Sequence, residues 1–436
     1  MNIKSSLQEI KFGFQPSFWV ANFMELFERL AYYGQATILS IYLRDYLKFS
    51  EVETGQLSSI FGGLIYLLPI FAGALADRYG FRKAFSFAFG ILAIGYFLIG
   101  SVGMDTFAGI YPGSNLFPIL AIILILTAIG GSFIKPSVLG TIALTSSPRT
   151  KSFGYAIYYW LVNTGAAIGP ILAFFVRDSF GISFVYIVSS VSCALMFLTT
   201  IFFFKEPANI LDKKQESFKV IFKNIVFVLS NVKFMFFLLL YGLYWVLFWQ
   251  TYIVVPFYVS DFISPNAPIE IILSLGGWTI MLTQLPLNRL TKNIPTHKAI
   301  LTGFSLAALA WLVMYFLLPA TQGQTINILF WKDVPLGIPI IMLGIFIFSI
   351  GEQTQAPRYY EYIADLAPEG QTALFQGYAF LPIAFAWGFG GTFGGWIYEV
   401  FVNVMHKPEL IFLTIFFIGL LATILMWVYN KFVIKK

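Results

Sequence analysis

Apolar runs of about 20 residues recur along the chain and are separated by short, charged breaks rich in turn-forming residues. About 20 consecutive apolar residues are enough for a helix to cross the hydrocarbon core of a membrane. The pattern therefore predicts about twelve membrane-spanning helices. We place them at roughly 16–43, 55–76, 83–103, 116–140, 151–175, 181–204, 233–260, 270–290, 297–318, 336–363, 371–402 and 409–431.

The break at 205–232 is the longest polar stretch and divides the chain nearly in half. We predict an N-terminal six-helix bundle at 1–204, a cytoplasmic linker at 205–232 and a C-terminal six-helix bundle at 233–436. An even number of spans places both termini on one side of the membrane. If that side is the cytoplasm, about 19 of the 27 lysines and arginines lie there, as the positive-inside rule requires. The expected location is the plasma (inner) membrane, with both termini cytoplasmic.

Composition favours the same class, an all-α integral membrane protein. Hydrophobic residues make up 58% of the chain and charged residues 11%, against about 25% charged in a soluble domain. The net charge of +6 reflects the basic cytoplasmic loops, which can contact the lipid bilayer, so we expect no nucleic-acid partner. Cys193 is the single cysteine, and His297 and His406 lie in separate predicted loops. We therefore expect no metal site and no disulfide.

Three charged residues lie inside the first predicted helix, which is the most informative feature of the sequence. They are Glu25, Glu28 and Arg29, and Lys135 lies deep in the helix predicted at 116–140, next to Pro136. One ionised side chain costs at least ~2.5–3.5 kcal/mol at the centre of a membrane helix, so these groups need partners or a function. Together they could gain and lose one proton near neutral pH, as proton coupling requires. A purely structural ion cluster is the alternative.

The loop between the second and third helices reads Gly-Ala-Leu-Ala-Asp-Arg-Tyr-Gly-Phe-Arg-Lys at 73–83. This run resembles the loop signature G-x3-D-R-x-G-x-R-K of the major facilitator superfamily, although an ordinary positive-inside loop is the alternative reading. We expect Asp77 to accept hydrogen bonds from the amides at a neighbouring helix start, and Gly80 to form the turn. The predicted motif residues are Gly73, Asp77, Arg78, Gly80, Arg82 and Lys83.

Within that superfamily, the first-helix run at 25–34 resembles the motif E-x-x-E-R-F-x-Y-Y-G of the proton-dependent oligopeptide transporter (POT) family, with Leu30 in place of the Phe. The run at 130–136 is similar to the family's G-G-x-K-P with an insertion, and the run at 158–165 to F-Y-x-x-I-N-x-G. A Gly-Glu followed by Ala-Pro at 351–357 looks like the glutamate and Ser-Pro of the family's tenth helix. The resemblance covers both halves and is tighter in the first.

The second half departs from the family. Where the seventh helix of the family has a Glu-Gln pair, this chain has Phe248-Trp249-Gln250, so the acid is missing. The asparagine of the family's eighth helix has no clear counterpart at 274–278. We therefore expect the proton-coupling residues of the first half to be retained. We expect the substrate pocket of the second half to be formed by other residues than in the family.

The resemblance implies a proton-coupled symporter that imports di- and tripeptides or peptide-like zwitterions by alternating access. It implies a carrier that uses the proton gradient and no cofactor. We expect it to act as a monomer and not to be an enzyme or receptor, because the sequence has no recognisable nucleophile–base pair or metal-ligand cluster. The fork of donors on Arg29 suits a substrate carboxylate, and Glu352 suits an ammonium group. The alternative is a proton-driven carrier of a non-peptide substrate, such as an amino-acid derivative, a drug-like compound or an organic anion.

The sequence thus yields three groups of candidate residues. Glu25, Glu28, Arg29 and Lys135 are the predicted proton-coupling residues. Arg358 and Glu361, three residues apart on one helix, are the predicted gate, with a structural helix-end contact as the alternative. The predicted substrate-binding residues are Arg29, Tyr32, Tyr33, Lys135, Tyr159, Asn163, Trp249, Trp278 and Glu352.

Overall fold

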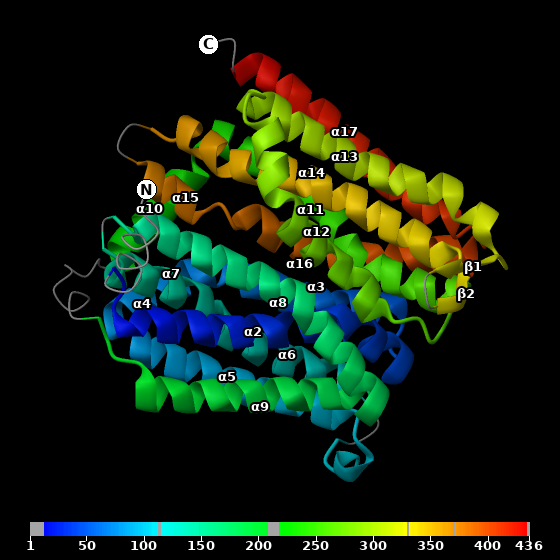
Figure 1. The fold of residues 1–436 in the computed structure, drawn as a ribbon, viewed down its shortest axis with the longest axis horizontal. Coiled ribbons are helices and arrows are strands. Elements are labelled where there is room, and N and C mark those ends of the chain that lie inside the picture. Colours follow the sequence, from blue (N-terminus) through cyan, green and yellow to red (C-terminus); the bar gives the residue numbers. More distant parts are fainter. Residues whose placement is uncertain are drawn as a thin grey trace. The chain divides into compact units, whose positions relative to one another are not determined.

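The computed structural model describes residues 13–111, 115–147, 149–207, 218–328, 331–368 and 371–433 (Figure 1). Helices dominate this part of the chain. Up to residue 207 they are α2 (Pro16–Ile41), α3 (Glu51–Leu67), α4 (Pro69–Tyr79), α5 (Phe81–Val102), α6 (Leu116–Ser132), α7 (Ile134–Thr145), α8 (Lys151–Phe180) and α9 (Ile182–Phe203). They continue with α10 (Phe218–Leu229), α11 (Val232–Tyr258), α12 (Ile269–Thr291), α13 (Thr296–Leu317), α14 (Gly337–Leu366), α15 (Thr372–Gly377), α16 (Leu381–Tyr398) and α17 (Glu409–Val433).

Nine helical segments among the described residues are long and apolar enough to cross a membrane, and the bent pair α3 and α4 makes a tenth. Two further helices are long enough but less apolar. α2 has 26 residues, about 39 Å at 1.5 Å per residue, and holds the three charged residues. α16 has 18 residues, is rich in glycine and continues into a π-helical turn, η6 (Glu399–Val404). With these two, the described helices account for the twelve spans expected from the sequence.

The predicted spans agree with the helices within a few residues, except where a helix is broken. α3 and α4 meet at an angle of 44°, because Pro69 lacks the amide proton that would continue the helix. The helix predicted at 116–140 is divided into α6 and α7 at Phe133. The helix predicted at 371–402 is instead α15 followed by α16, which begins with Pro382 in its first turn.

Two elements were not expected from the sequence. The stretch predicted as a linker contains the helix α10, while residues 208–217 of that stretch lie outside the described residues. A two-stranded antiparallel sheet, β1 (Thr325–Ile328) and β2 (Trp331–Pro335), pairs residue 325 with 335 and residue 328 with 331. It precedes α14 and connects two spanning helices, so it leaves the all-helical membrane region intact.

The contacts divide the chain into two compact units. Unit 1 contains residues 1–35 and 64–222, and unit 2 contains residues 36–63 and 223–436. Residues 36–63 pack with unit 2 because glycines permit close approach: a Cβ on Gly55 would lie 2.3 Å from the carbonyl oxygen of Gly391, and one on Gly395 would lie 2.1 Å from that of Glu51. The division at 1–204, 205–232 and 233–436 remains a prediction.

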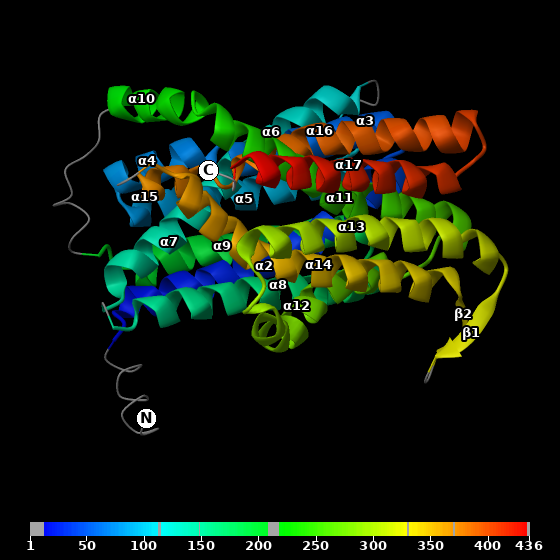
Figure 2. The ribbon, with the colours of Figure 1, turned by 90° about the horizontal axis from the view of Figure 1, so that it is seen from above.

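Within each unit, neighbouring helices pack along much of their length. In unit 1, α5 packs on α6 and α9. In unit 2, α13 packs on α14 and α17, and α11 packs on α16; Figure 2 shows α13 and α14 side by side. These pairs supply the scaffold on which the charged and aromatic side chains described below are held.

Candidate functional site

The charged cluster of unit 1 begins on α2, where Glu25, Glu28 and Arg29 are 0%, 1% and 7% exposed. The Nε atom of Arg29 lies 3.3 Å from Oε1 of Glu25. Arg29 also pairs with Glu28 through Nε and Nη2, both directed at Oε2. One guanidinium therefore serves two buried carboxylates, and its contact with Glu28 is the closer of the two.

α8 packs directly against this charged segment because it presents two glycines four residues apart. A Cβ on Gly165 would lie 2.4 Å from the Cβ of Arg29, and a Cβ on Gly169 would lie 2.6 Å from the carbonyl oxygen of Leu30. On α2 itself, a Cβ on Gly34 would lie 3.1 Å from the carbonyl oxygen of Gly169. Small residues at this spacing allow two membrane helices to approach closely, which limits the room around the Arg29 side chain.

Lys135 lies on α7, where it is half-buried. Its ammonium group interacts electrostatically with Arg29, Glu25 and Glu28, and its Nζ atom lies 5.9 Å from the centre of the Tyr66 ring. The structure thus brings together the four residues predicted to couple to protons. Two acids and two bases make the fully ionised cluster neutral, which reduces the cost of holding it inside a membrane protein.

Tyrosines surround the cluster. Arg29 lies over the ring of Tyr32, with Cζ 4.9 Å from the ring centre, and Tyr33 contacts Tyr32 edge to face at 5.2 Å. Tyr158 of α8, only 7% exposed, interacts electrostatically with Glu25 and Arg29. Sequence reasoning missed Tyr158, although it lies seven residues, or two helical turns, before Gly165 and therefore on the same helix face.

Two other predicted binding residues on α8 are arranged differently. Tyr159 is 44% exposed, whereas Asn163 is buried. The Nδ2 atom of Asn163 donates a hydrogen bond to the carbonyl oxygen of Tyr159, 2.8 Å away and one turn earlier in the same helix. Tyr158, rather than Tyr159, is therefore the α8 tyrosine that faces the charges.

Glu352 of unit 2 is half-buried on α14 and lies beside an aromatic group. It interacts electrostatically with Tyr244 of α11. The ring of Tyr244 lies 5.5 Å from that of Phe348 and stacks on Phe304 at 5.0 Å. Phe348 is one helical turn before Glu352, so the carboxylate lies at the edge of an aromatic surface.

α11 carries an aromatic stripe, defined by Trp245, Phe248 and Tyr252, around the run 248–250 where the acid of the related family is missing. Phe248 lies 5.1 Å from Trp245 and 5.6 Å from Tyr252 between ring centres, and the three side chains are half-exposed. Trp249 is 5% exposed and stacks on Trp387 at 3.5 Å. Trp249 therefore packs against Trp387 inside unit 2.

Trp278, the other tryptophan predicted to bind substrate, lies on α12 and is half-buried.

The predicted gate residues lie near the C-terminal end of α14. Nη1 of Arg358 is 2.9 Å from Oε2 of Glu361, and Nη2 donates to the carbonyl oxygens of Thr291 and Lys292 at 3.3 Å each. Arg358 therefore also satisfies carbonyl groups at the C-terminal end of α12, as a helix cap does.

The motif at 73–83 forms the turn between α4 and α5. Gly80 has φ of 93°, a conformation that favours glycine, and a Cβ there would lie 3.0 Å from the carboxylate of Glu206. Glu206 accepts hydrogen bonds from the amides of Phe81 and Arg82, at 2.7 and 2.8 Å. The carboxylate that accepts hydrogen bonds from the first amides of α5 is therefore that of Glu206, which follows α9 and lies in the stretch predicted as a linker.

The other motif residues lie around this turn. Gly73 of α4 faces α7, where a Cβ would lie 3.4 Å from the Cβ of Pro136. Nη2 of Arg82 donates to the carbonyl oxygen of Ile201 on α9, and Arg78 lies over the ring of Tyr79. Arg82 and Glu206 thus connect the α4–α5 turn to the end of α9. Asp77 lies in α4 and Lys83 is exposed in α5, and their predicted roles remain predictions.

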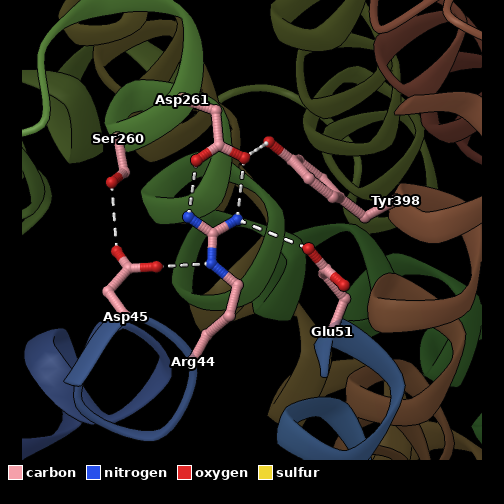
Figure 3. A network of polar contacts seen from close by, with 6 residues as sticks. All are labelled: Arg44, Asp45, Glu51, Ser260, Asp261 and Tyr398. Atoms are coloured by element: carbon pink, nitrogen blue, oxygen red, sulfur yellow. Dashed lines mark hydrogen bonds and ion pairs between the residues drawn. The ribbon is translucent and has the colours of Figure 1, made fainter. Parts of the chain in front are cut away.

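A polar network that sequence reasoning missed lies in unit 2 (Figure 3). Arg44 lies in a π-helical turn, η1 (Tyr42–Tyr46), and Asp261 in another, η4 (Val259–Ile263). Nη1 and Nη2 of Arg44 donate to Oδ2 and Oδ1 of Asp261 at 2.9 and 2.8 Å. This bidentate pair is the strongest form of arginine–carboxylate contact.

Four further contacts extend the network. Nε of Arg44 donates to Asp45 at 2.6 Å, and Nη1 lies 3.9 Å from Glu51. Asp45 accepts from Ser260 at 3.0 Å, and Asp261 accepts from the Tyr398 hydroxyl at 2.6 Å (Figure 3). Arg44 and Asp261 directly follow the helices predicted at 16–43 and 233–260, and opposite charges at these ends were the signal that could have revealed the pair.

The sequence model of the Major Facilitator Superfamily matches residues 21–331 and 251–432. The Bacillus subtilis protein named Uncharacterized transporter YclF is 32% identical over 178 residues, 39% of this chain and 34% of that protein. Dipeptide and tripeptide permease A of Escherichia coli is 31% identical over 183 residues, 41% of this chain and 34% of the permease. The match thus covers about a third of the length of these relatives.

Solved structures show the same fold at low sequence identity. A POT family transporter in complex with a thioalcohol-conjugated peptide has a TM-score of 0.74 at 17% identity, covering 96% of each chain. A POT family transporter with 5-aminolevulinic acid has a TM-score of 0.74 at 18% identity, covering 97% of each chain. A mutant of the nucleoside transporter NupG has a TM-score of 0.73 at 15% identity, covering 95% of this chain and 99% of that one.

These findings confirm the predicted fold class, an all-α, multi-pass membrane protein. Because the family model extends over both halves, the chain belongs to the major facilitator superfamily.

Proposed function

We propose that the protein is a proton-coupled symporter that imports di- and tripeptides or peptide-like zwitterions by alternating access. It is a carrier rather than an enzyme, it acts as a monomer and it takes its energy from the proton gradient. The observation that carries this proposal is the buried cluster of Glu25, Glu28, Arg29 and Lys135. The sequence resemblance to peptide permeases supports the substrate class.

The charge balance of the cluster explains how a proton and a substrate could be coupled. The cluster is neutral when all four groups are ionised, and one added proton gives it a net charge of +1. A buried net charge is costly, and a substrate carboxylate would remove it. Glu28 is the proposed proton acceptor because its protonation would weaken its pairing with Arg29. The freed guanidinium donors could then bind the carboxylate.

Glu352 is the proposed site for the substrate's ammonium group. Aromatic faces attract cations, and Tyr244 lies next to the Glu352 carboxylate. The aromatic stripe of Trp245, Phe248 and Tyr252 offers apolar surface for substrate side chains. Glu352 and this stripe would therefore favour zwitterions with apolar or aromatic side chains over those with acidic ones.

The network around Arg44 is proposed to keep one end of unit 2 closed. Arg44 follows α2 and Asp261 follows α11, and both helices are proposed to begin at the cytoplasmic side and end outside. The bidentate pair would hold residues 36–63 on unit 2 at the outer side. Opening to the outside would require this pair to separate.

The topology is part of the proposal. We place the protein in the plasma (inner) membrane with both termini cytoplasmic, in contact with bilayer lipids. The basic residues expected in the linker at 208–217 and at the tail, including Lys435 and Lys436, lie outside the described residues. A reporter domain fused after Lys436 should be active only in a cytoplasmic assay; activity of a periplasmic reporter would contradict the topology.

A proton-driven carrier of a non-peptide substrate is the second candidate. The aromatic stripe favours it, because the acid that the family has on this helix is missing beside the stripe, where this chain has Phe248-Trp249-Gln250. Uptake of radiolabelled dialanine into proteoliposomes, with and without an inward proton gradient, separates the two. Peptide transport predicts accumulation above equilibrium that needs the gradient. No uptake, together with gradient-driven uptake of an amino-acid derivative, would favour the second candidate.

A further inference from the structure

An apolar groove opens on the side of unit 1, separate from the charged cluster. It has a volume of ≈ 1050 Å³ and is lined by residues of α2, α8 and α9, three helices of unit 1 that can be followed in Figure 1. Thr200 of α9 contacts the sulfur of Met24 on α2 at 3.1 Å, which fixes these two helices beside each other. The groove is as large as pockets that hold drug-sized ligands, about 300–1,000 Å³.

The lining is mainly aromatic and aliphatic, with Asn22 and Thr199 as its polar members, and its tryptophans are accessible. Trp19 is 45% exposed and Trp160 is 57% exposed. Since α8 and α9 are long and apolar enough to cross a membrane, an exposed apolar face on them would meet lipid rather than water. On α2 the groove runs from Trp19 to Leu26, about 10 Å at 1.5 Å per residue, most of one leaflet's share of a ~30 Å hydrocarbon core.

Two lysines stand at the end of the groove where α2 and α8 begin and α9 ends. Lys151 is exposed and lies two residues before Phe153, which lines the groove. Lys205 is also exposed, and its carbonyl oxygen accepts a hydrogen bond from Ser17, two residues before Trp19. The mouth is held in shape by Phe14, whose ring lies 5.7 Å from Trp19 and 6.4 Å from Phe153.

We propose that this groove binds an anionic phospholipid of the leaflet on that side, which the proposed topology makes the cytoplasmic one. One acyl chain lies in the groove between Trp19 and Trp160, and Lys151 and Lys205 hold the phosphate of the head group. Two basic residues at an anionic lipid surface, each worth about five-fold in affinity, together give the acidic lipid a preference of about 25-fold. The proposal concerns a lipid site and does not depend on which substrate is transported.

Tryptophan quenching by lipids with brominated acyl chains tests the proposal in proteoliposomes. Brominated phosphatidylglycerol should quench the protein more strongly than brominated phosphatidylcholine at the same low mole fraction. The excess quenching should fall in Trp160→Phe and be lost when Trp19→Phe is added, because these two tryptophans are the reporters that line the groove. Equal quenching by the two lipids would mean that the groove holds only bulk lipid and would overturn the proposal.

Two kinds of variant distinguish the head-group site from the acyl-chain groove. One removes the lysine charges, and the other fills the groove with a larger side chain. Lys151→Gln combined with Lys205→Gln should reduce the preference for phosphatidylglycerol about tenfold or more while keeping quenching by phosphatidylcholine. Lys298→Gln, an exposed lysine at the start of α13, is the matched control and should change nothing. Ala156→Phe, at an exposed groove position, should reduce quenching by both lipids. A preference unchanged in the double lysine variant would refute the head-group site.

Discussion

Arg44 and Asp261 form a bidentate ion pair across 217 residues of sequence, with both contacts at 2.8–2.9 Å. Both residues lie in π-helical turns that end long helices, and such turns occur often at functional sites. The pair joins the segment 36–63 to the C-terminal helices of unit 2. This contact is the proposed closure on the outer side.

Arg44→Lys should loosen that closure. A lysine keeps the charge but cannot form two parallel hydrogen bonds, and a charge-assisted bond contributes about 1.5–3 kcal/mol. Opening should then be about tenfold more frequent. Labelling of Ser40→Cys, a buried position near Arg44, by an impermeant maleimide should rise accordingly. The native Cys193 is buried and should stay unlabelled. An unchanged labelling rate would show that the pair does not control access.

Glu28→Gln should abolish proton-driven accumulation while substrate counterflow persists, because glutamine imitates the protonated acid and cannot release a proton. Lys135→Ala should do the same by removing one base of the cluster. Uptake into proteoliposomes with an imposed proton gradient measures the first activity, and exchange without a gradient measures the second. Asp105→Asn, at an exposed position, is the control. Normal accumulation by both variants would remove these residues from proton coupling.

Gly165→Ala should destabilise unit 1. Its new Cβ would lie 2.4 Å from the Cβ of Arg29, a distance that forces α2 and α8 apart and costs about 1–3 kcal/mol. Gly242→Ala is a matched control within a helix, since the nearest atom to its Cβ would be 3.9 Å away. Thermal unfolding in detergent should show a lower Tm for the first variant only. Equal Tm values would mean that the two helices have room to separate.

Glu352→Gln should weaken binding of substrates with a free amine more than binding of N-acetylated analogues. The carboxylate is the proposed partner of the ammonium group, and the amide lacks its charge. Competition for uptake by free and acetylated dialanine measures the difference, with Phe348→Leu as a variant that alters the aromatic edge and keeps the acid. Equal loss for both ligands would assign a structural role to Glu352.

Membrane spans were predictable from the sequence because the constraint that creates them is local. A helix in lipid must satisfy its own backbone and expose apolar side chains, so length and hydropathy alone place most boundaries within a few residues. The same logic singled out Glu25, Glu28, Arg29 and Lys135, since each is costly in an apolar segment whatever surrounds it. The loss of the family's acid at 248–250 on α11 could also be read from the sequence alone.

Tertiary structure alone decided which side chains meet. Tyr158, and not Tyr159, faces the charges because α8 turns its glycine face, which includes Gly165, toward Arg29. Glu206 caps α5 although 125 residues separate it from Phe81, and Arg44 pairs with Asp261 at a still larger separation. Contacts of this kind depend on how helices rotate and pack against one another, which the periodicity of a single helix does not specify. The chain's hydropathy determined where its helices run, and their packing determined which polar groups they bring together.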